Sequence, residues 1–301
     1  MPKENTHLYF SKNINKVNMP YTGIINQNIN YYYLGSVTPD TFYYSKNIDI
    51  QKVSDVIHGK YGQPTNELIF DLLDLAKKNN DEKILSFTMG FITHCYLDII
   101  FHPIIFYLTG NFYDENLTRR EEAIFRHRRL EVTIDQKLNK DSYFENLIDK
   151  KIFKDINFIE ILSNSFNIPP EDVELSFERQ YVLNKIFHKK YYLNILYFLN
   201  KIGILNRKSE VSLFYGNLKN DYILNDNIEY RDLFNGEAFS VSLSELFDKA
   251  NLKTKLALGS AYKYYKGEES RIQAIVNISG ENLDTGSKTY SVDDIKFFIN
   301  N

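Results

Sequence analysis

One predicted helix constrains the fold more than any other feature of the sequence. Residues 81–101 form a mainly apolar run, whose large apolar side chains surround the helix axis: Ile84, Phe87, Phe91, Tyr96, Leu97 and Phe101. A helix that is apolar on every side is a buried helix. Pro103 is expected to end it or kink it. We therefore expect an all-α fold, a multi-helix bundle built around this segment.

Three potential metal ligands lie within or just beyond this apolar helix. His94, Asp98 and His102 follow one another at intervals of four residues, which places all three on one helix face. The outer two are about 12 Å apart along the axis, at about 1.5 Å per residue. Zn–N bonds are only about 2.0–2.1 Å long, whereas the two oxygens of Asp98 can bridge. The spacing therefore predicts two metal positions along one helix.

Other candidate ligands are spread along the chain. His127 and Glu131 share a face of a predicted helix over 118–138. His7, Asp40 and His58 lie upstream, where each fits a ligand supplied by a loop or a helix end. Taken singly, a buried histidine is more often a hydrogen-bonded core residue, and an aspartate such as Asp40 can simply cap a helix. Together they favour a metal site, and only His188 is left outside it.

The remaining sequence also predicts helices. They cover residues 5–17, 64–79, 143–166, 171–202, 242–266 and 292–299, with turns over 18–40 and a few β-like residues after 271. No repeat or linker divides the chain. We predict a single all-α domain over residues 1–301, with a ligand-bearing core at about 5–135 and a helical part at about 140–301.

Composition excludes several other classes of site. With 36 Lys+Arg and 39 Asp+Glu, the net charge of −3 gives no basic excess for binding extended nucleic acid. The single cysteine, Cys95, excludes an intrachain disulfide and a thiolate zinc finger. No apolar run approaches about 18 residues, and the polar N-terminus does not resemble a signal peptide. The expected location is the cytoplasm.

The ordered set of ligands resembles that of the zinc-dependent phospholipase C family, which is related in fold to the fungal single-strand nucleases. The family pattern is an early His, an Asp after a loop, an isolated His, His-x-x-x-Asp followed by His, and His-x-x-x-Glu. The matching residues are His7, Asp40, His58, His94, Asp98, His102, His127 and Glu131. Asp135 continues the last motif, and residues 230–246 resemble a C-terminal stretch of cytoplasmic bacterial members.

The resemblance implies a ligand set for each metal. One zinc would be held by Asp40, His58, His94 and Asp98, and a second by His102, His127 and Glu131. Asp98 and His7 would bind a third zinc. Secreted relatives complete that third site with the amine of an N-terminal Trp, a residue absent from this chain. Asp40 would also act in catalysis, by orienting or deprotonating the attacking water.

The expected function is metal-dependent hydrolysis of a phosphodiester, in the manner of a phospholipase C. A zinc-bound hydroxide would attack phosphorus in line, with a phospholipid headgroup as the favoured substrate. The donors suit zinc, although manganese and iron stay open. The alternatives are a zinc nuclease or nucleotide phosphoesterase, and a metal-stabilised binding protein without turnover. Peripheral membrane contact is expected only for a bilayer substrate, no basic amphipathic anchor stands out, and no protein partner is predicted.

Overall fold

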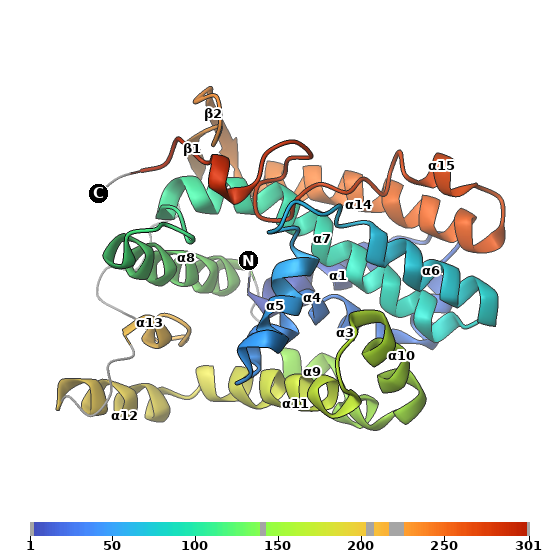
Figure 1. Cartoon of the computed structure of the whole chain (residues 1–301), viewed down its shortest axis with the longest axis horizontal. Helices are drawn as coiled ribbons and strands as arrows, with labels where there is room; N and C mark the ends of the chain where they lie inside the picture. The colour runs from blue at the N-terminus through green and yellow to red at the C-terminus, as the bar shows by residue number, and fades with distance from the viewer. Residues whose placement is uncertain (1–2, 139–142, 203–207, 217–225, 300–301) are drawn as a thin grey trace.

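A computed structural model of the chain describes residues 3–138, 143–202, 208–216 and 226–299. Its central element is helix α7 (Glu82–Thr109), against which several other helices pack (Figure 1). Asp81 caps this helix by accepting hydrogen bonds from the amides of Lys83 and Ile84. Nearly every side chain from Ile84 onward is buried. The prediction of a buried central helix is confirmed, although α7 continues through Pro103 instead of ending there.

The described residues are otherwise mostly helical. The α-helices are α1 (Glu4–Asn15), α2 (Thr22–Gln27), α3 (Ile29–Gly35), α4 (Thr38–Thr41), α5 (Ile48–Ile57), α6 (Glu67–Asn79), α8 (Leu117–Leu138), α9 (Phe144–Leu147), α10 (Ile156–Phe166), α11 (Pro170–Phe187), α12 (Lys190–Lys201), α13 (Lys208–Val211), α14 (Leu243–Lys266) and α15 (Arg271–Ala274). Short 3₁₀ helices are η1 (Phe42–Tyr44), η2 (Lys150–Lys154) and η3 (Val292–Asp294). The all-α prediction is therefore confirmed, whereas the extent of a single domain stays a prediction.

Several boundaries differ from those expected. Residues 18–40 were expected to be turns, yet they contain α2, α3 and most of α4. The expected helices over 143–166 and 171–202 are each broken, and only the 3₁₀ turn η3 forms within 292–299. One antiparallel hairpin was not predicted: β1 (Asn227–Arg231) pairs with β2 (Ala238–Ser242), with Asn227 opposite Ser242. Short helices have too few turns for a clear periodic pattern in the sequence. Their formation therefore depends on packing against α7.

Two glycines allow α3 to lie directly against α7. A Cβ built on Gly35 would be 2.0 Å from the carbonyl oxygen of Phe87, and one built on Gly90 would be 1.9 Å from that of Tyr32. Neither position can hold a larger residue without moving a backbone. This close crossing fixes where the chain leaves α3, and α4 follows immediately with Asp40.

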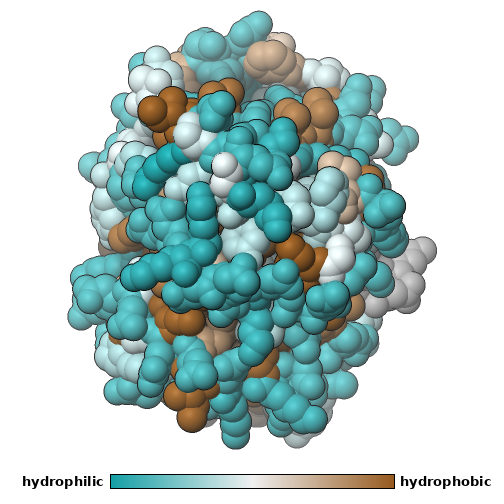
Figure 2. Space-filling model, turned by 90° about the vertical axis from the view of Figure 1, so that its right-hand side faces the viewer, coloured by the Kyte–Doolittle hydropathy of each residue, from teal (hydrophilic) through white to brown (hydrophobic). Residues whose placement is uncertain are grey.

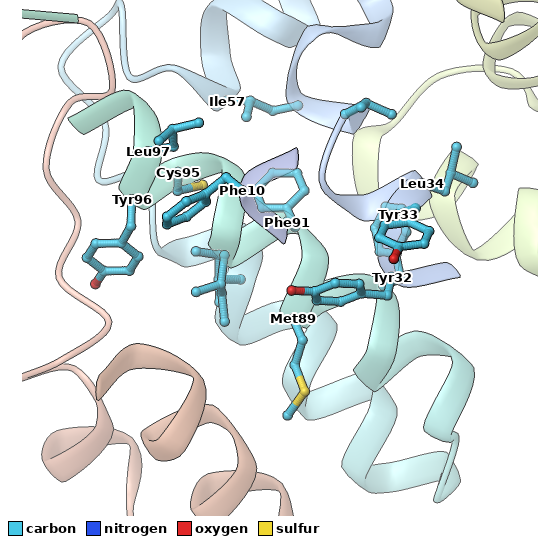
Figure 3. Close-up of a cluster of buried hydrophobic side chains, with 14 of the residues drawn as sticks. Phe10, Tyr32, Tyr33, Leu34, Ile57, Met89, Phe91, Cys95, Tyr96 and Leu97 are labelled. Atoms are coloured by element: carbon cyan, nitrogen blue, oxygen red, sulfur yellow. The ribbon is translucent and has the colours of Figure 1, made fainter. Parts of the chain in front are cut away.

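The core forms around α7 on several sides. Phe10 of α1 and Ile57 of α5 lie in the same buried cluster as Phe91 and Cys95 of α7 (Figure 3). Tyr96 points the other way and donates its hydroxyl to the carbonyl of Asn277. No apolar run near the length of a membrane span was expected from the sequence, yet α7 is long and apolar enough to cross a membrane. Its most apolar stretch of 18 residues is, however, 100% buried within the protein. That burial is the environment of a core helix.

One side of the molecular surface is shown in Figure 2. The side formed by the right-hand ends of α6, α7 and α14 in Figure 1 is mostly hydrophilic, with scattered apolar side chains (Figure 2). Helix α12 lies at the opposite end of the molecule, at the lower left of Figure 1.

Candidate metal centre

Helix α7 supplies three of the eight predicted ligands. His94, Asp98 and His102 are completely buried and lie on one helix face, as their spacing predicted. The other five come from α1, α4, the residue after α5, and α8, and each of the eight is at most 5% exposed. The structure thus brings together every residue of the predicted set, from five separate parts of the chain.

The carboxylate of Asp98 lies at the centre of the cluster. Four imidazoles approach it through Nε2: His7 at 3.3 Å and His102 at 4.0 Å from Oδ1, and His94 at 2.9 Å and His58 at 3.5 Å from Oδ2. One oxygen therefore faces His7 and His102, and the other faces His58 and His94. This division gives Asp98 the geometry of a bridging ligand.

Asp40 faces two of these four histidines, His58 and His94. Its Oδ1 atom lies 3.4 Å from Nε2 of His58 and 3.7 Å from Nε2 of His94. Asp40, His58 and His94 form one group of donor atoms within 4.8 Å of one another, and His7, His94 and Asp98 form another. The rings of His7 and His94 are stacked, with centroids 3.7 Å apart.

A further group lies between α7 and α8. His102, His127 and Glu131 also place their donor atoms within 4.8 Å of one another, and Nε2 of His127 is 3.0 Å from Oε1 of Glu131. The ring centroids of His102 and His127 are 5.8 Å apart. Phe106 and Phe112 pack against His127 edge to face. Donor groups therefore lie at both ends of the α7 motif, and the number of metal ions that they hold stays a prediction.

Backbone carbonyls fix the orientation of three histidines. Nδ1 of His58 lies 2.7 Å from the carbonyl oxygen of Ser54. Nδ1 of His94 lies 2.9 Å from the carbonyl oxygen of Ser36, and Nδ1 of His102 lies 2.8 Å from that of Leu283. Because a carbonyl only accepts, each Nδ1 carries the proton. Each Nε2 is then a lone-pair donor directed at the cluster, the arrangement found in metal-binding histidines.

Several buried polar atoms of the cluster have no hydrogen-bond partner, which bears on whether these residues suit a metal. Nε2 of His58, His94 and His102 and both oxygens of Asp98 are buried without a hydrogen bond, and so is Oδ1 of Asp40. Unpaired buried polar atoms are costly, and natural proteins rarely retain a group of them without a ligand. The donors are nitrogen and oxygen only, in the numbers that zinc requires. The residues therefore fit a cluster of zinc ions.

The electrostatics of the cluster also suit cations. Burial would raise the pKa of Asp98, but the adjacent imidazoles of His94, His102 and His7 outweigh it and hold that pKa well below the usual range. Burial lowers the pKa of His102 and of His127 well below that of a free histidine. Burial also disfavours the charged form of His58 and of His94, but Asp98 and Asp40 outweigh it and raise the pKa of both rings. The cluster therefore combines an ionised Asp98 with His102 and His127, which are neutral at pH 7 and available to bind a cation.

The C-terminal segment supplies a residue that the sequence did not indicate. Oδ1 of Asp284 lies 3.4 Å from Nδ1 of His102, and its Oδ2 accepts a 2.9 Å hydrogen bond from Tyr113. The segment is held in place by Leu283, whose amide donates to the carbonyl of His58. Burial raises the pKa of Asp284. The only local signal was a turn-like Asn-Leu-Asp-Thr-Gly run at 282–286.

Two further residues that the sequence pattern singled out, Asp135 and His188, lie away from the cluster. Asp135, which extends the α8 motif, accepts hydrogen bonds from the hydroxyls of Thr6 and Tyr215. His188, which the sequence left outside the site, stacks on Tyr215 with ring centroids 3.9 Å apart. Its Nε2 is 3.3 Å from Nδ2, the side-chain amide nitrogen of Asn5. Both residues join the N-terminal helix to the segment after α13.

A large cavity reaches the cluster. Its volume is about 1360 Å³, and Asp40, His127, Glu131 and Asp284 are among its lining residues. Much of the remaining wall is apolar, with side chains contributed by α11 and α12: Leu175, Val182, Leu183, Ile186, Tyr192, Ile195, Leu196 and Leu199. A substrate with both a polar and an apolar part fits such a cavity.

These observations define a mainly helical protein with a buried cluster of histidines and carboxylates that could hold metal ions. The family model for zinc dependent phospholipase C matches residues 6–183, and the chain belongs to this family. Membership makes it a metal-dependent hydrolase of the phospholipase type, with zinc as the implied metal. Comparison with curated proteins and with solved structures found no significant match.

Proposed function

We propose that this protein hydrolyses the phosphodiester that joins a phospholipid headgroup to its glycerol. The observation that carries the proposal is the cavity: buried metal-binding side chains and a long apolar wall belong to one continuous space. A phospholipid has the same two parts, because its charged phosphodiester is attached to acyl chains. Family membership independently supports a lipid or phosphodiester substrate.

The ligand assignment in this proposal combines the groups of donor atoms with the contacts that Asp98 makes with His94 and His58. Asp40, His58, His94 and Asp98 hold one zinc, and His102, His127 and Glu131 hold the second. Asp98 and His7 offer donors for a third. Zinc at these positions supplies a water of lowered pKa and compensates the negative charge that develops on the phosphoryl oxygens.

Asp40 is the residue that we assign to proton transfer. It lines the cavity, and its buried Oδ1 atom has no hydrogen-bond partner. In the proposed reaction Asp40 orients a water and accepts its proton as the water oxygen bonds to phosphorus. The bond between phosphorus and the glycerol oxygen breaks, and the proton is delivered to that oxygen. The products are a diacylglycerol and a phosphorylated headgroup.

The apolar wall favours a lipid over the alternatives. A nuclease would need a basic path for the phosphate backbone, whereas the charged side chains of this cavity wall are of both signs and stand beside a long apolar surface. A binding protein without turnover would be expected to have a closed metal site, whereas this cluster is reached by a large cavity.

Substitution of Asp98 tests the proposal. In Asp98→Asn the central charge is lost while the shape is kept, so we expect zinc content to fall and turnover to drop at least about 100-fold. The control is Asp71→Asn, which removes an exposed carboxylate from α6. The assays are elemental analysis and hydrolysis of a chromogenic phosphocholine ester, of phosphatidylcholine and of single-stranded DNA. Unchanged turnover in Asp98→Asn, or cleavage of DNA alone, contradicts the proposal.

A further inference from the structure

Helix α12 carries an exposed apolar stripe. Tyr191 is 70% exposed, Ile195 37%, Phe198 61% and Ile202 48%. Their spacing of four, three and four residues places them on one face of the helix. The opposite side holds the helix to the protein, since Leu193 and Leu196 pack with Phe187, Val211 and Phe214. One side of α12 is therefore anchored and the other presents large apolar groups to the surroundings.

The stripe is continuous with the cavity that reaches the metal cluster. Tyr192, Ile195, Leu196 and Leu199 of α12 line that cavity, together with the buried residues Asp40, His127 and Glu131. Ile195 belongs to both the stripe and the cavity wall. The cavity thus runs from the buried cluster to the surface at α12, and its apolar lining is continued outside by the stripe.

The charged side chains of α12 and of the residues that flank it are all positive. Residues 188–202 contain no acidic residue, and Lys189, Lys190 and Lys201 are all exposed. Lys46, also exposed, belongs to the cavity lining. The rest of that lining carries charges of both signs, so the positive excess belongs to α12 and the residues beside it, in contrast with a net charge of −3 for the chain. An amphipathic helix with apolar and aromatic groups beside lysines is suited to the surface of an anionic bilayer.

We infer that α12 docks this protein on an anionic phospholipid surface, with Tyr191, Ile195, Phe198 and Ile202 inserted among the lipids and the lysines facing their headgroups. The inference rests on the proposed function and deepens it. A lipid could then pass from the bilayer along Ile195 into the cavity without exposing its acyl chains to water. The sequence pattern alone had indicated no such anchor, because the apolar face becomes evident only when the packed side of α12 is known.

Another exposed apolar patch provides a contrast. Ile272 and Val276, near α15, are 83% and 74% exposed. This patch follows Glu268 and Glu269, and its arginine, Arg271, is paired with Glu67 at 2.7 Å. Neither Ile272 nor Val276 lines the cavity. The patch therefore lacks the charge and the continuity that distinguish α12, and it offers a matched control.

The experiment measures binding of the zinc-loaded protein to sedimented vesicles. Vesicles of phosphatidylcholine alone are compared with vesicles containing phosphatidylglycerol, in the cold to limit hydrolysis. The variants are Tyr191→Glu and Phe198→Glu, neither of which alters a residue that lines the cavity. The control is Ile272→Glu. Hydrolysis of a soluble chromogenic phosphocholine ester and the elution volume in size-exclusion chromatography are measured for every protein.

We expect the wild type to prefer the anionic vesicles and each α12 variant to bind about tenfold more weakly, from the loss of one inserted side chain. Ile272→Glu should bind like the wild type, and all four proteins should cleave the soluble ester equally.

Three outcomes overturn the docking inference. In the first, the wild type cleaves the ester but binds no vesicles in this assay, and in the second, Ile272→Glu loses as much vesicle binding as the α12 variants do. The third outcome is an α12 substitution that converts a dimer to a monomer. Vesicle binding that depends on α12 without any ester or lipid hydrolysis would support docking and contradict the proposed function.

Discussion

Gly90 lies against the backbone of Tyr32 so closely that a Cβ at position 90 would be 1.9 Å from the Tyr32 carbonyl oxygen. This contact joins α3 to the helix that bears three of the candidate ligands. Ser36 follows α3, and its carbonyl oxygen lies 2.9 Å from Nδ1 of His94. The position of His94, a candidate metal ligand, therefore depends on a helix crossing that only glycine allows.

Gly90→Ala should disturb both stability and the site. The added methyl group must separate α3 from α7, so we expect a loss of about 3 kcal/mol in the free energy of unfolding. We also expect weaker zinc binding, because Ser36 moves with α3. Gly259→Ala is the control, since a Cβ on Gly259 of α14 meets nothing within 4 Å. That change should be neutral or stabilising by about 0.5–1 kcal/mol. Urea denaturation distinguishes the two, and equal stability of the variants would refute the interpretation.

The central helix and the order of the ligands could be predicted because they are local properties. His94, Asp98 and His102 need only helical spacing to share a face, and the same holds for His127 and Glu131. The apolar run around the first three already indicated that they would be buried. The structure agrees on both points. What each residue binds stays a prediction until metal is measured.

Contacts between distant parts of the chain could not be predicted in this way. The carbonyl of Leu283 meets His102 across 181 residues, and no periodic pattern marks either partner for the other. Pro103 was expected to end or kink the helix, yet packing on all sides of α7 sustains the helix beyond it. Chain topology brings Asp284 to the cluster, and no local sequence pattern specifies that topology.

Asp284→Asn should weaken zinc binding while leaving the fold intact. Asp284 lies beside Nδ1 of His102 and is held by Tyr113, so it acts as a positioning residue for that imidazole. Loss of such a partner typically lowers metal affinity about 10–100-fold. Competition with a chelator measures the affinity, and thermal unfolding of the zinc-free proteins reports any effect on the fold alone. Asp293→Asn, at an exposed position of η3, should match the wild type. Unaltered zinc affinity in Asp284→Asn would remove the assigned role.

Removal of metal should destabilise the protein. Five unpaired buried donor atoms belong to His58, His94, His102 and Asp98, and zinc would satisfy them. A ligand at 100 times its dissociation constant stabilises the folded state by about 2.7 kcal/mol. Chelation should therefore lower the thermal midpoint, and added zinc should restore it. Asp98→Asn serves as the comparison, because its midpoint should respond much less to either treatment. A thermal midpoint that stays unchanged after verified loss of zinc would show that these atoms are not metal ligands.

Asp135 should give stability a specific pH dependence. The residue is buried in α8, where its carboxylate accepts hydrogen bonds from Thr6 and Tyr215. Burial raises its pKa from the model-peptide value of 3.8 to about 6. The folded state therefore binds this proton more tightly than the unfolded chain does. Its stabilising contribution is complete below pH 3.8 and is lost as the pH rises through about 6.

Asp135→Asn removes this titration while keeping a side chain that can bond to both hydroxyls. A shift of about two pKa units corresponds to about 3 kcal/mol. The free energy of unfolding of the wild type, minus that of the variant, should thus fall by about 3 kcal/mol between about pH 4 and pH 7.5. Urea titrations of zinc-free proteins across this range measure the difference. Asp71→Asn, at an exposed site, should show no comparable fall. A difference that stays constant with pH for Asp135→Asn would mean that this carboxyl group is already ionised throughout the range, and that Lys3, whose pKa burial lowers to about 8, compensates its charge.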